Sequence, residues 1–376
     1  MLRWEIHPNR KSNAMCSSLS KSFRNFVFLS VFVSQLSCTG EMMENMKTLP
    51  YAFGDINMLA IIGDENILES PITDSILFYY ASSFPILPQP EPMLDLRFLK
   101  PADLTADPLR KQFRTYLLLG DLSDPESATT KMMVQLAGEA SIEEVRRNPA
   151  NNIVIGKDKW ARDQMLILQF AQNREELLQN LKKNAPGIIR RVYDHDKFKI
   201  DATVYLTKRN PKLEQEVRDK IGINIEIPGD YFQALSDGEV IWFRKETPET
   251  SSNLMFRKLP YTDKKQLSRE GLKAIRDSIG LKYVSSRIQG SYMKINDKDL
   301  PLFITPITFN GQYALEARGI WEIENDYMGG AFVSYLLLNP VKNELIFLDG
   351  FLHAPGEEKR NFVQYMDHIL HTAKIL

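Results

Sequence analysis

Cysteine is almost absent from this sequence of 376 residues, which contains only Cys16 and Cys38. Because both lie before residue 40, the body of the chain has no disulfide framework, no thiolate metal cluster and no cysteine nucleophile. Its stability must therefore come from packing. A hydrophobic content of 43% with 25% charged residues is ordinary for a protein that buries a core.

An excess of charge of either sign is also missing, because the formal net charge is −1 at pH 7. This balance gives no overall field to attract nucleic acid, which we do not expect as a partner. The sequence after the cysteines also lacks a G-x-S-x-G elbow, a glycine-rich phosphate loop and a His-Glu-x-x-His motif. We therefore predict no catalytic residue, no metal and no cofactor, and we favour a protein that is not an enzyme.

The apolar run near the N-terminus is too short to cross a bilayer, which takes about 20 residues. Lys21 and Arg24 precede the uncharged stretch 25–37, and Leu36-Ser37-Cys38 ends it, a pattern typical of a signal peptide. The ending resembles a bacterial lipobox, although Gln35 stands where that pattern usually has Leu or Val. We predict that Cys38 is lipidated. The alternative is an apolar run followed by a chance cysteine.

These features divide the chain into four expected parts. They are a leader with the signal peptide at 1–37, a tether at 38–50, an N-terminal α+β half at 51–200 and a C-terminal α+β half at 201–376. Met15 would make a tidier start of the leader than Met1. Removing the leader takes away five basic residues and one acidic residue, so the net charge falls from −1 to −5. Acyl chains rather than electrostatics would then hold the protein to an anionic bilayer.

Helices and strands alternate along the rest of the chain. Apolar residues at helical spacing predict helices at 73–82, 173–184, 212–220, 268–278 and 358–372. Short apolar or alternating runs predict strands at 57–62, 113–119, 164–170, 224–227, 239–245, 302–307, 313–321, 331–338 and 344–352. The pattern indicates an α+β fold with mainly antiparallel sheets and packed helices. Each half ends in a strand followed by a helix, which leaves open that the two halves are related.

Proline and glycine suggest where the regular elements stop. Pro186-Gly187 is expected to end the helix 173–184, and 339–343 is expected to form a hairpin turn. The four prolines of segment 85–92 predict an extended, polyproline-like path, either a docking peptide or a rigid crossover. Gly329-Gly330 is expected to mark a tight turn with positive φ.

Several short segments together resemble one known family. They are 49–54, 87–92, 158–164, 227–231, 240–244, 327–332 and 349–355. The resemblance is to a lipoprotein family of Bacteroidota catalogued as domain of unknown function 4837, and it covers nearly all of the chain after the leader. That family usually has proline where Asp163 and Ala331 stand. The resemblance implies a secreted envelope lipoprotein and implies no known activity.

The best candidate for ligand contact is the cluster of Trp160, Arg162 and Asp163, directly before a predicted strand. An indole offers a stacking face and a guanidinium can engage an anion. The alternative is a tryptophan that closes the core beside a surface Arg–Asp pair.

Two histidine motifs are weaker candidates. His368 and His371, with Asp367 or His353, could hold a divalent metal, or could be solvated on the flank of the last helix. Asp194-His195-Asp196 could orient an imidazole for base catalysis, but adjacent residues of a loop or strand point in different directions. Trp242 and Trp321, each in an apolar strand, are expected in the core.

We expect a lipoprotein, acylated with diacylglycerol and palmitate, in the outer membrane and facing the periplasm or the cell surface. Its partners would be the membrane, through the lipid anchor, and a small ligand or another envelope protein. The rival hypothesis is an envelope-polymer hydrolase that uses paired carboxylates. Two Asp or Glu side chains facing each other across a cleft, about 5–9.5 Å apart, would favour it.

Overall fold

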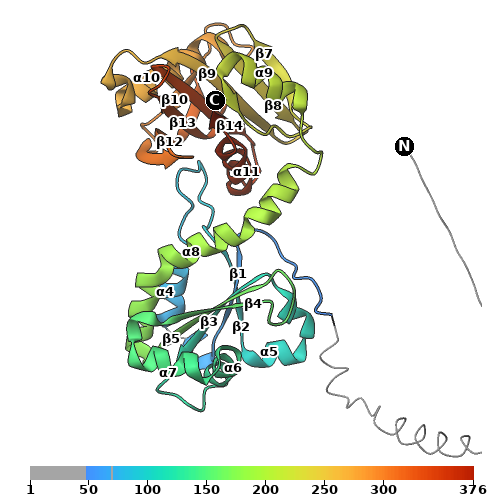
Figure 1. Ribbon diagram of the computed structural model, residues 1–376, viewed down its shortest axis with the longest axis vertical. Helices are drawn as coiled ribbons and strands as arrows, with labels where there is room; N and C mark the ends of the chain where they lie inside the picture. The colour runs from blue at the N-terminus through green and yellow to red at the C-terminus, as the bar shows by residue number, and fades with distance from the viewer. Residues whose placement is uncertain (1–47, 69–70) are drawn as a thin grey trace, which may run out of the picture. The chain divides into compact units, whose positions relative to one another are not determined.

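The computed structural model describes residues 48–68 and 71–376, and residues 50–376 form one compact unit (Figure 1). Cys38, the leader and most of the tether lie outside the described residues. Among the described helices, none combines the length and the apolar character needed to cross a membrane.

The first half contains a five-stranded sheet in the order β2-β1-β3-β5-β4. Its strands are β1 Met58–Ile62, β2 Asp95–Leu99, β3 Thr115–Asp121, β4 Ile153–Lys157 and β5 Met165–Ala171. Helices cover both faces, α4 and α8 on one and α5, α6 and α7 on the other (Figure 1). They are α4 Pro71–Tyr80, α5 Pro101–Ala106, α6 Ala128–Ala137, α7 Glu139–Arg147 and α8 Arg174–Val204.

The second half contains an eight-stranded antiparallel sheet in the order β10-β12-β13-β14-β9-β8-β7, with β11 also paired to β12. Its strands are β7 Phe232–Ser236, β8 Val240–Glu246, β9 Ser251–Pro260, β10 Met293–Asn296, β11 Phe303–Phe309, β12 Gln312–Ile323, β13 Gly329–Asn339 and β14 Glu344–His353. Helices α9 (Pro211–Ile221) and α11 (Arg360–His371) pack on one face and α10 (Arg269–Tyr283) packs on the other.

Shorter elements complete the described fold. They are α3 Glu65–Leu68, η2 Pro108–Gln112, η3 Pro149–Asn151, η4 Lys264–Leu267 and the small sheet of β6 Ile223–Asn224 with β15 Lys374–Ile375. The α+β class is confirmed, as is the hairpin between β13 and β14.

The two sheets differ in strand direction. In the first sheet β1 runs parallel to β2 and β3, β3 runs parallel to β5, and β4 is the antiparallel strand. The mainly antiparallel arrangement that we expected therefore describes the second sheet and not the first. Strands β1 and β5 are buried along their whole length. Their apolar runs therefore show no alternation of apolar and polar residues, and we could not infer from them which strands pair or whether they run parallel. Two unlike topologies give no sign that the halves are related.

Helix α8 does not end at Pro186, as we expected, but continues to Val204. Proline in a helix interior costs about 3 kcal/mol. The apolar stripe that continues past it offsets that cost: Ile188 and Val192 pack in the core of the first half, and Ile200 and Val204 in the core of the second. The boundary that we expected at residue 200 therefore falls inside one helix that serves both halves.

Two further predictions from glycine and proline were wrong. Segment 85–92 does not follow an extended path but doubles back, since Ser83 bridges Pro92 and Ile86 has φ 69°. Gly329-Gly330 forms no tight turn but begins β13, without positive φ. A Cβ at Gly330 would collide with the carbonyl oxygen of Leu352, so the close approach of two strands explains this glycine.

An ion pair lies inside the second half, between α10 and β14. Arg276 and Asp349 are each 1% exposed, and Arg276 Nε donates to Asp349 Oδ1 at 3.1 Å. The same oxygen accepts from the Ser334 hydroxyl at 2.5 Å, and the guanidinium lies 3.7 Å from the ring centroid of Phe332.

Candidate functional site

The cluster of Trp160, Arg162 and Asp163 lies where the chain enters the fold. Trp160 is half-buried, and its ring meets Tyr116 edge-on at 5.3 Å. Arg162 and Asp163 are exposed. The backbone of Arg162 bonds that of residues 50–52, and its guanidinium lies 5.6 Å from the centroid of Tyr51. These three residues are not among the lining residues of five hollows on the described part of the chain.

Asp194, His195 and Asp196 lie on α8, and not in the loop or strand that we expected, and they point in three directions. Asp194 pairs with Lys197 at the surface, while Asp196 is buried and accepts from Arg114 and from the backbone N–H of Asn57. Burial raises the pKa of Asp196 and lowers that of His195. The motif therefore does not place an imidazole between two carboxylates.

The two tryptophans expected in the core lie on opposite sides of the β14 residue Phe351. Trp321 is buried, and Trp242 is half-buried against the same cluster. His353 lies apart from the last helix, with its Nδ1 3.2 Å from the carbonyl oxygen of Gly329. Within residues 48–68 and 71–376, no group of three His, Cys, Asp or Glu side chains is arranged to hold a metal ion.

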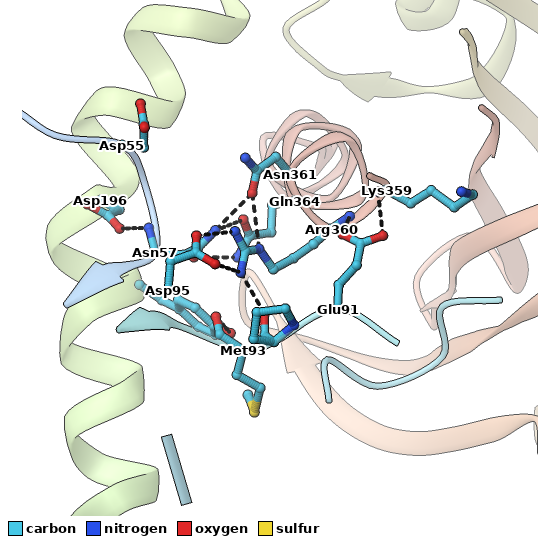
Figure 2. Close-up of polar contacts among 12 residues, drawn as sticks. Asp55, Asn57, Glu91, Met93, Asp95, Asp196, Lys359, Arg360, Asn361 and Gln364 are labelled. Carbon is cyan, nitrogen blue, oxygen red and sulfur yellow. Dashed lines mark hydrogen bonds and ion pairs between the residues drawn. The ribbon is translucent and has the colours of Figure 1, made fainter. Parts of the chain in front are cut away.

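The turn 81–94 is attached to the first turn of α11 by buried polar contacts (Figure 2). The carboxylate of Glu91 accepts from the backbone N–H groups of Lys359 at 2.6 Å and Arg360 at 2.8 Å. It thereby caps a helix whose own N-cap side chain makes no capping bond. Arg360 in turn donates to the carbonyl oxygen of Pro92 and to both carboxylate oxygens of Asp95.

Asn57 makes a second connection, from the residue before β1 to the same helix (Figure 2). Its amide exchanges hydrogen bonds with Gln364 at 2.8 and 3.0 Å and donates to Asn361 at 3.0 Å. Its backbone N–H donates to Asp196 at 2.6 Å. Three elements distant in sequence, the start of β1, α8 and α11, therefore meet at one residue, Asn57.

A pocket of about 450 Å³ lies beside these contacts, a volume in the range of small-molecule sites. The turn contributes apolar side chains, α8 contributes an apolar and polar wall, and β12 and α11 contribute a charged floor. The lining residues are Phe84, Pro85, Met93, Tyr193, Lys197, Ile200, Arg318, Gln364, Asp367, His368 and His371.

The charged floor is built from one face of two paired strands and the helix that covers them. Glu316 and Arg318 alternate along β12, and Glu316 stands opposite Tyr335 of β13. Arg318 donates through Nε to Glu316 at 2.6 Å and through one terminal nitrogen to Asp367 at 2.8 Å. The Tyr335 hydroxyl donates to the other oxygen of Asp367. His371 completes the network with its Nδ1 3.2 Å from Asp367.

The network shifts the pKa values of Asp367 and His371. Burial alone would raise the pKa of Asp367, but the charge of Arg318 and the hydrogen bonds from His371 and Tyr335 outweigh it and hold that pKa far below its usual value. Burial would likewise lower the pKa of His371, and the bond to Asp367 reverses the shift. Burial raises the pKa of Tyr193 on the opposite wall to about 12, so its hydroxyl remains a donor near neutral pH.

Asp367 lines this pocket, and Glu316, which lies outside the lining, shares its hydrogen-bond partners. One guanidinium and one phenol connect them, and Asp367 stays ionised. A carboxyl that donates a proton to a glycosidic leaving group needs a raised pKa. Asp367 therefore lacks the raised pKa that the proton donor of acid–base hydrolysis requires.

Sequence reasoning named Asp367, His368 and His371 and placed the two histidines on a solvated flank of the last helix. The side chain of His371 is 47% exposed there, and it also stacks on Phe309, with ring centroids 5.1 Å apart, and bonds Asp367. Arg318 was missed altogether. A signal was available, because charged residues at alternate positions of an apolar strand place both on one face.

Solved structures resemble parts of the chain only distantly. The Ran-binding protein Mog1p of Saccharomyces cerevisiae is 7% identical with a TM-score of 0.28, and the match covers 41% of this chain and 90% of Mog1p. A protein of Bacteroides thetaiotaomicron VPI-5482 is 10% identical with a TM-score of 0.24, over 41% of this chain and 45% of that protein. The lipid transfer and protein localization domain of human StarD13 is 13% identical with a TM-score of 0.20, over 43% and 95%. Likenesses this low carry no argument about function.

No curated protein matches the sequence. Two family models do, and each covers one half. Residues 52–204 match a Domain of unknown function (DUF8532), so the resemblance that we expected over nearly all of the chain is split between two families. Residues 210–372 match the Domain of unknown function (DUF4837), the family that the landmark segments predicted.

Proposed function

We propose that this protein binds a small amphiphilic ligand in the pocket between the turn 81–94, α8 and α11 while a lipid on Cys38 holds it in the cell envelope. The observation that carries the binding proposal is the pocket itself. Its apolar walls face a fixed group of hydrogen-bonding side chains, the combination typical of ligand sites. Residues from both family segments line it, so its shape depends on the two segments together.

The chemistry of the walls suggests the class of ligand. Phe84, Met93 and Ile200 offer apolar contact to a hydrocarbon or ring. Within the described structure, the hydrogen bonds of Arg318 use its Nε and one terminal nitrogen, which leaves the other terminal nitrogen to donate to an incoming oxygen. Each cation of the floor already has a carboxylate partner. The pocket therefore fits a ligand with an apolar body and one oxygen-rich head group rather than a polyanion.

The pocket proposal predicts the behaviour of a dye that has these two features. We expect 8-anilinonaphthalene-1-sulfonate to bind the mature chain with saturable fluorescence, its rings against the apolar wall and its sulfonate at Arg318. Met93→Trp should fill the pocket and weaken binding at least about tenfold, the loss of about 1.4 kcal/mol. The measurement is a fluorescence titration with thermal melts of both proteins.

Leu281→Trp is the matched control, because Leu281 is 63% exposed on α10 and lies outside the pocket lining. It should leave the titration unchanged. Equal binding by wild type and a folded Met93→Trp protein would contradict the pocket proposal.

Support for the anchor comes from the Lys21–Cys38 pattern. The family resemblance, which implies an envelope lipoprotein, points the same way. A diacylated and palmitoylated Cys38 would place the protein at the outer membrane, facing the periplasm or the cell surface. One acyl chain gives only marginal, reversible binding, on the order of 10⁴ M⁻¹, so stable attachment needs two or three chains.

Replacement of Cys38 by alanine tests the anchor. We expect Cys38→Ala to abolish lipidation and to leave an uncleaved precursor or a soluble protein, because alanine has no thiol to acylate. Intact mass spectrometry of the membrane and soluble fractions measures this directly. Cys16→Ala is the control and should be lipidated normally. Acylated protein in the Cys38→Ala strain would refute the anchor without bearing on the pocket.

A further inference from the structure

Large apolar side chains alternate and stay exposed where the described chain begins. Leu49, Tyr51 and Phe53 are 38%, 68% and 46% exposed. In extended backbone, residues two apart point to the same side. Tyr51 and Phe53 therefore present their rings on one face of the segment, and Leu49 continues the alternation in the sequence.

This face is held in place by the first half of the fold. Arg162 N–H donates to the carbonyl oxygen of Pro50 at 2.8 Å, and Phe53 N–H donates to that of Gln112 at 2.8 Å. Phe53 meets Phe113 edge-on at 5.5 Å, and the Arg162 guanidinium lies 5.6 Å from the Tyr51 ring. The backbone hydrogen bonds hold the segment in place, each ring contacts the fold on one side, and both rings remain exposed.

The chain outside the described fold limits how far this face can be from an anchor. Twelve peptide units join Cys38 to Pro50, so the two residues are at most about 40 Å apart even when that stretch is fully extended. A tether this short gives a surface patch a high effective concentration at the bilayer. Weak contacts between the patch and the lipid are then sufficient to orient the protein.

Charge near the face is almost balanced. Lys157, Lys159 and Arg162 are exposed, and so are Asp158 and Asp163. A strongly basic patch would point to anionic headgroups, and this surface is not one. Aromatic rings with an arginine beside them fit the interfacial layer of a bilayer, where amphipathic rings and guanidinium groups are favoured.

We propose that Tyr51, Phe53 and Arg162, the tether-exit face, rest on the surface of the lipid bilayer and orient the folded body on the membrane. The inference rests on the proposed anchor at Cys38. It assigns Arg162, one of the three residues of the predicted ligand-contact cluster, to a lipid surface rather than to a soluble ligand.

The mature chain contains no cysteine other than Cys38, so a thiol-reactive probe labels only the cysteine that is introduced. Asp55→Cys, labelled with an environment-sensitive nitrobenzoxadiazole, places a probe two residues after Phe53 on a side chain that is 94% exposed. Val341→Cys places the same probe on a residue that is 91% exposed in the β13–β14 hairpin. The acylated mature chains are reconstituted in vesicles of phosphatidylethanolamine and phosphatidylglycerol.

We expect the fluorescence of the probe at position 55 to rise at least about twofold in vesicles, and the probe at 341 to stay unchanged. Tyr51→Ser with Phe53→Ser should abolish the rise. The matched control is Phe303→Ser with Tyr313→Ser, which removes two aromatic rings of comparable exposure, 51% and 46%, from β11 and β12. Thermal melts check that each variant is folded.

Flotation of the vesicles separates the two proposals. If the protein floats but probes 55 and 341 respond alike, the anchor stands and the tether-exit face is refuted. If the protein fails to float because Cys38 carries no lipid, the proposed anchor has failed. The mature chain with Cys38→Ser then tests the face alone, since it should still raise the fluorescence at position 55 when vesicles are in large excess, and no rise there refutes it.

Discussion

Asp349→Ala is expected to lower the free energy of unfolding by about 3–5 kcal/mol, the range for breaking one side of a buried ion pair. Arg276, which is 1% exposed, would keep its charge inside the second half with no carboxylate to balance it. The Ser334 hydroxyl would lose its acceptor as well. Urea unfolding followed by circular dichroism measures the change.

A double variant separates the cost of an unpaired charge from the value of the pair. Arg276→Met with Asp349→Leu removes both charges, and it should recover much of the stability, because a buried pair often contributes little compared with apolar residues. Glu126→Ala is the surface control, since its pair with Lys131 is exposed to solvent and should contribute little to stability. A loss below about 1 kcal/mol for Asp349→Ala would show that the pair is not isolated from water.

Met366→Asp should be at least as damaging, with an expected loss of several kcal/mol or failure to fold. Met366 is 1% exposed on α11 and packs in the core between that helix and the second sheet. An aspartate there would bring an unpaired charge into an apolar environment. Chemical unfolding, or the soluble yield when the protein is too unstable to purify, gives the measurement.

His368→Ala is the control on the same helix, because its imidazole is only partly covered and contacts the surface carboxylate of Asp201. It should change stability by no more than about 1 kcal/mol. Unimpaired folding of Met366→Asp would mean that α11 is not held by its apolar face and that the polar contacts at its first turn are sufficient.

Local patterns predicted most of the second half. The alternating and apolar runs located β8, β11, β12, β13 and β14 within a few residues, and the β13–β14 turn was found from its Asn-Pro and Asn residues. Strand β9 was missed, because the segment 251–260 begins with polar residues and ends in a proline. Pairing with β14 on one side and with β8 on the other stabilises β9 as a strand, although its own sequence does not indicate one.

The candidate site was only partly predictable. Asp367 and His371 were noticed as neighbours on a helix, but their partners Arg318 and Tyr335 lie on two strands far away in the sequence. Neither the pocket nor the low pKa of Asp367 follows from the last helix alone. Both depend on how α11 is placed over the sheet.

By itself the sequence determined many of the local elements, the apolar face of α11, the absence of disulfide chemistry in the body and the family that the second half matches. Tertiary structure decided what local signals could not: that α8 continues through Pro186, that the first sheet is mainly parallel and that Glu91 caps α11 from a turn 268 residues earlier. The physical reason is the same in each case. Periodicity and turn residues indicate which conformation a short segment favours by itself. Burial against distant segments contributes enough free energy to override the cost of a proline in a helix and to bring a charged network together.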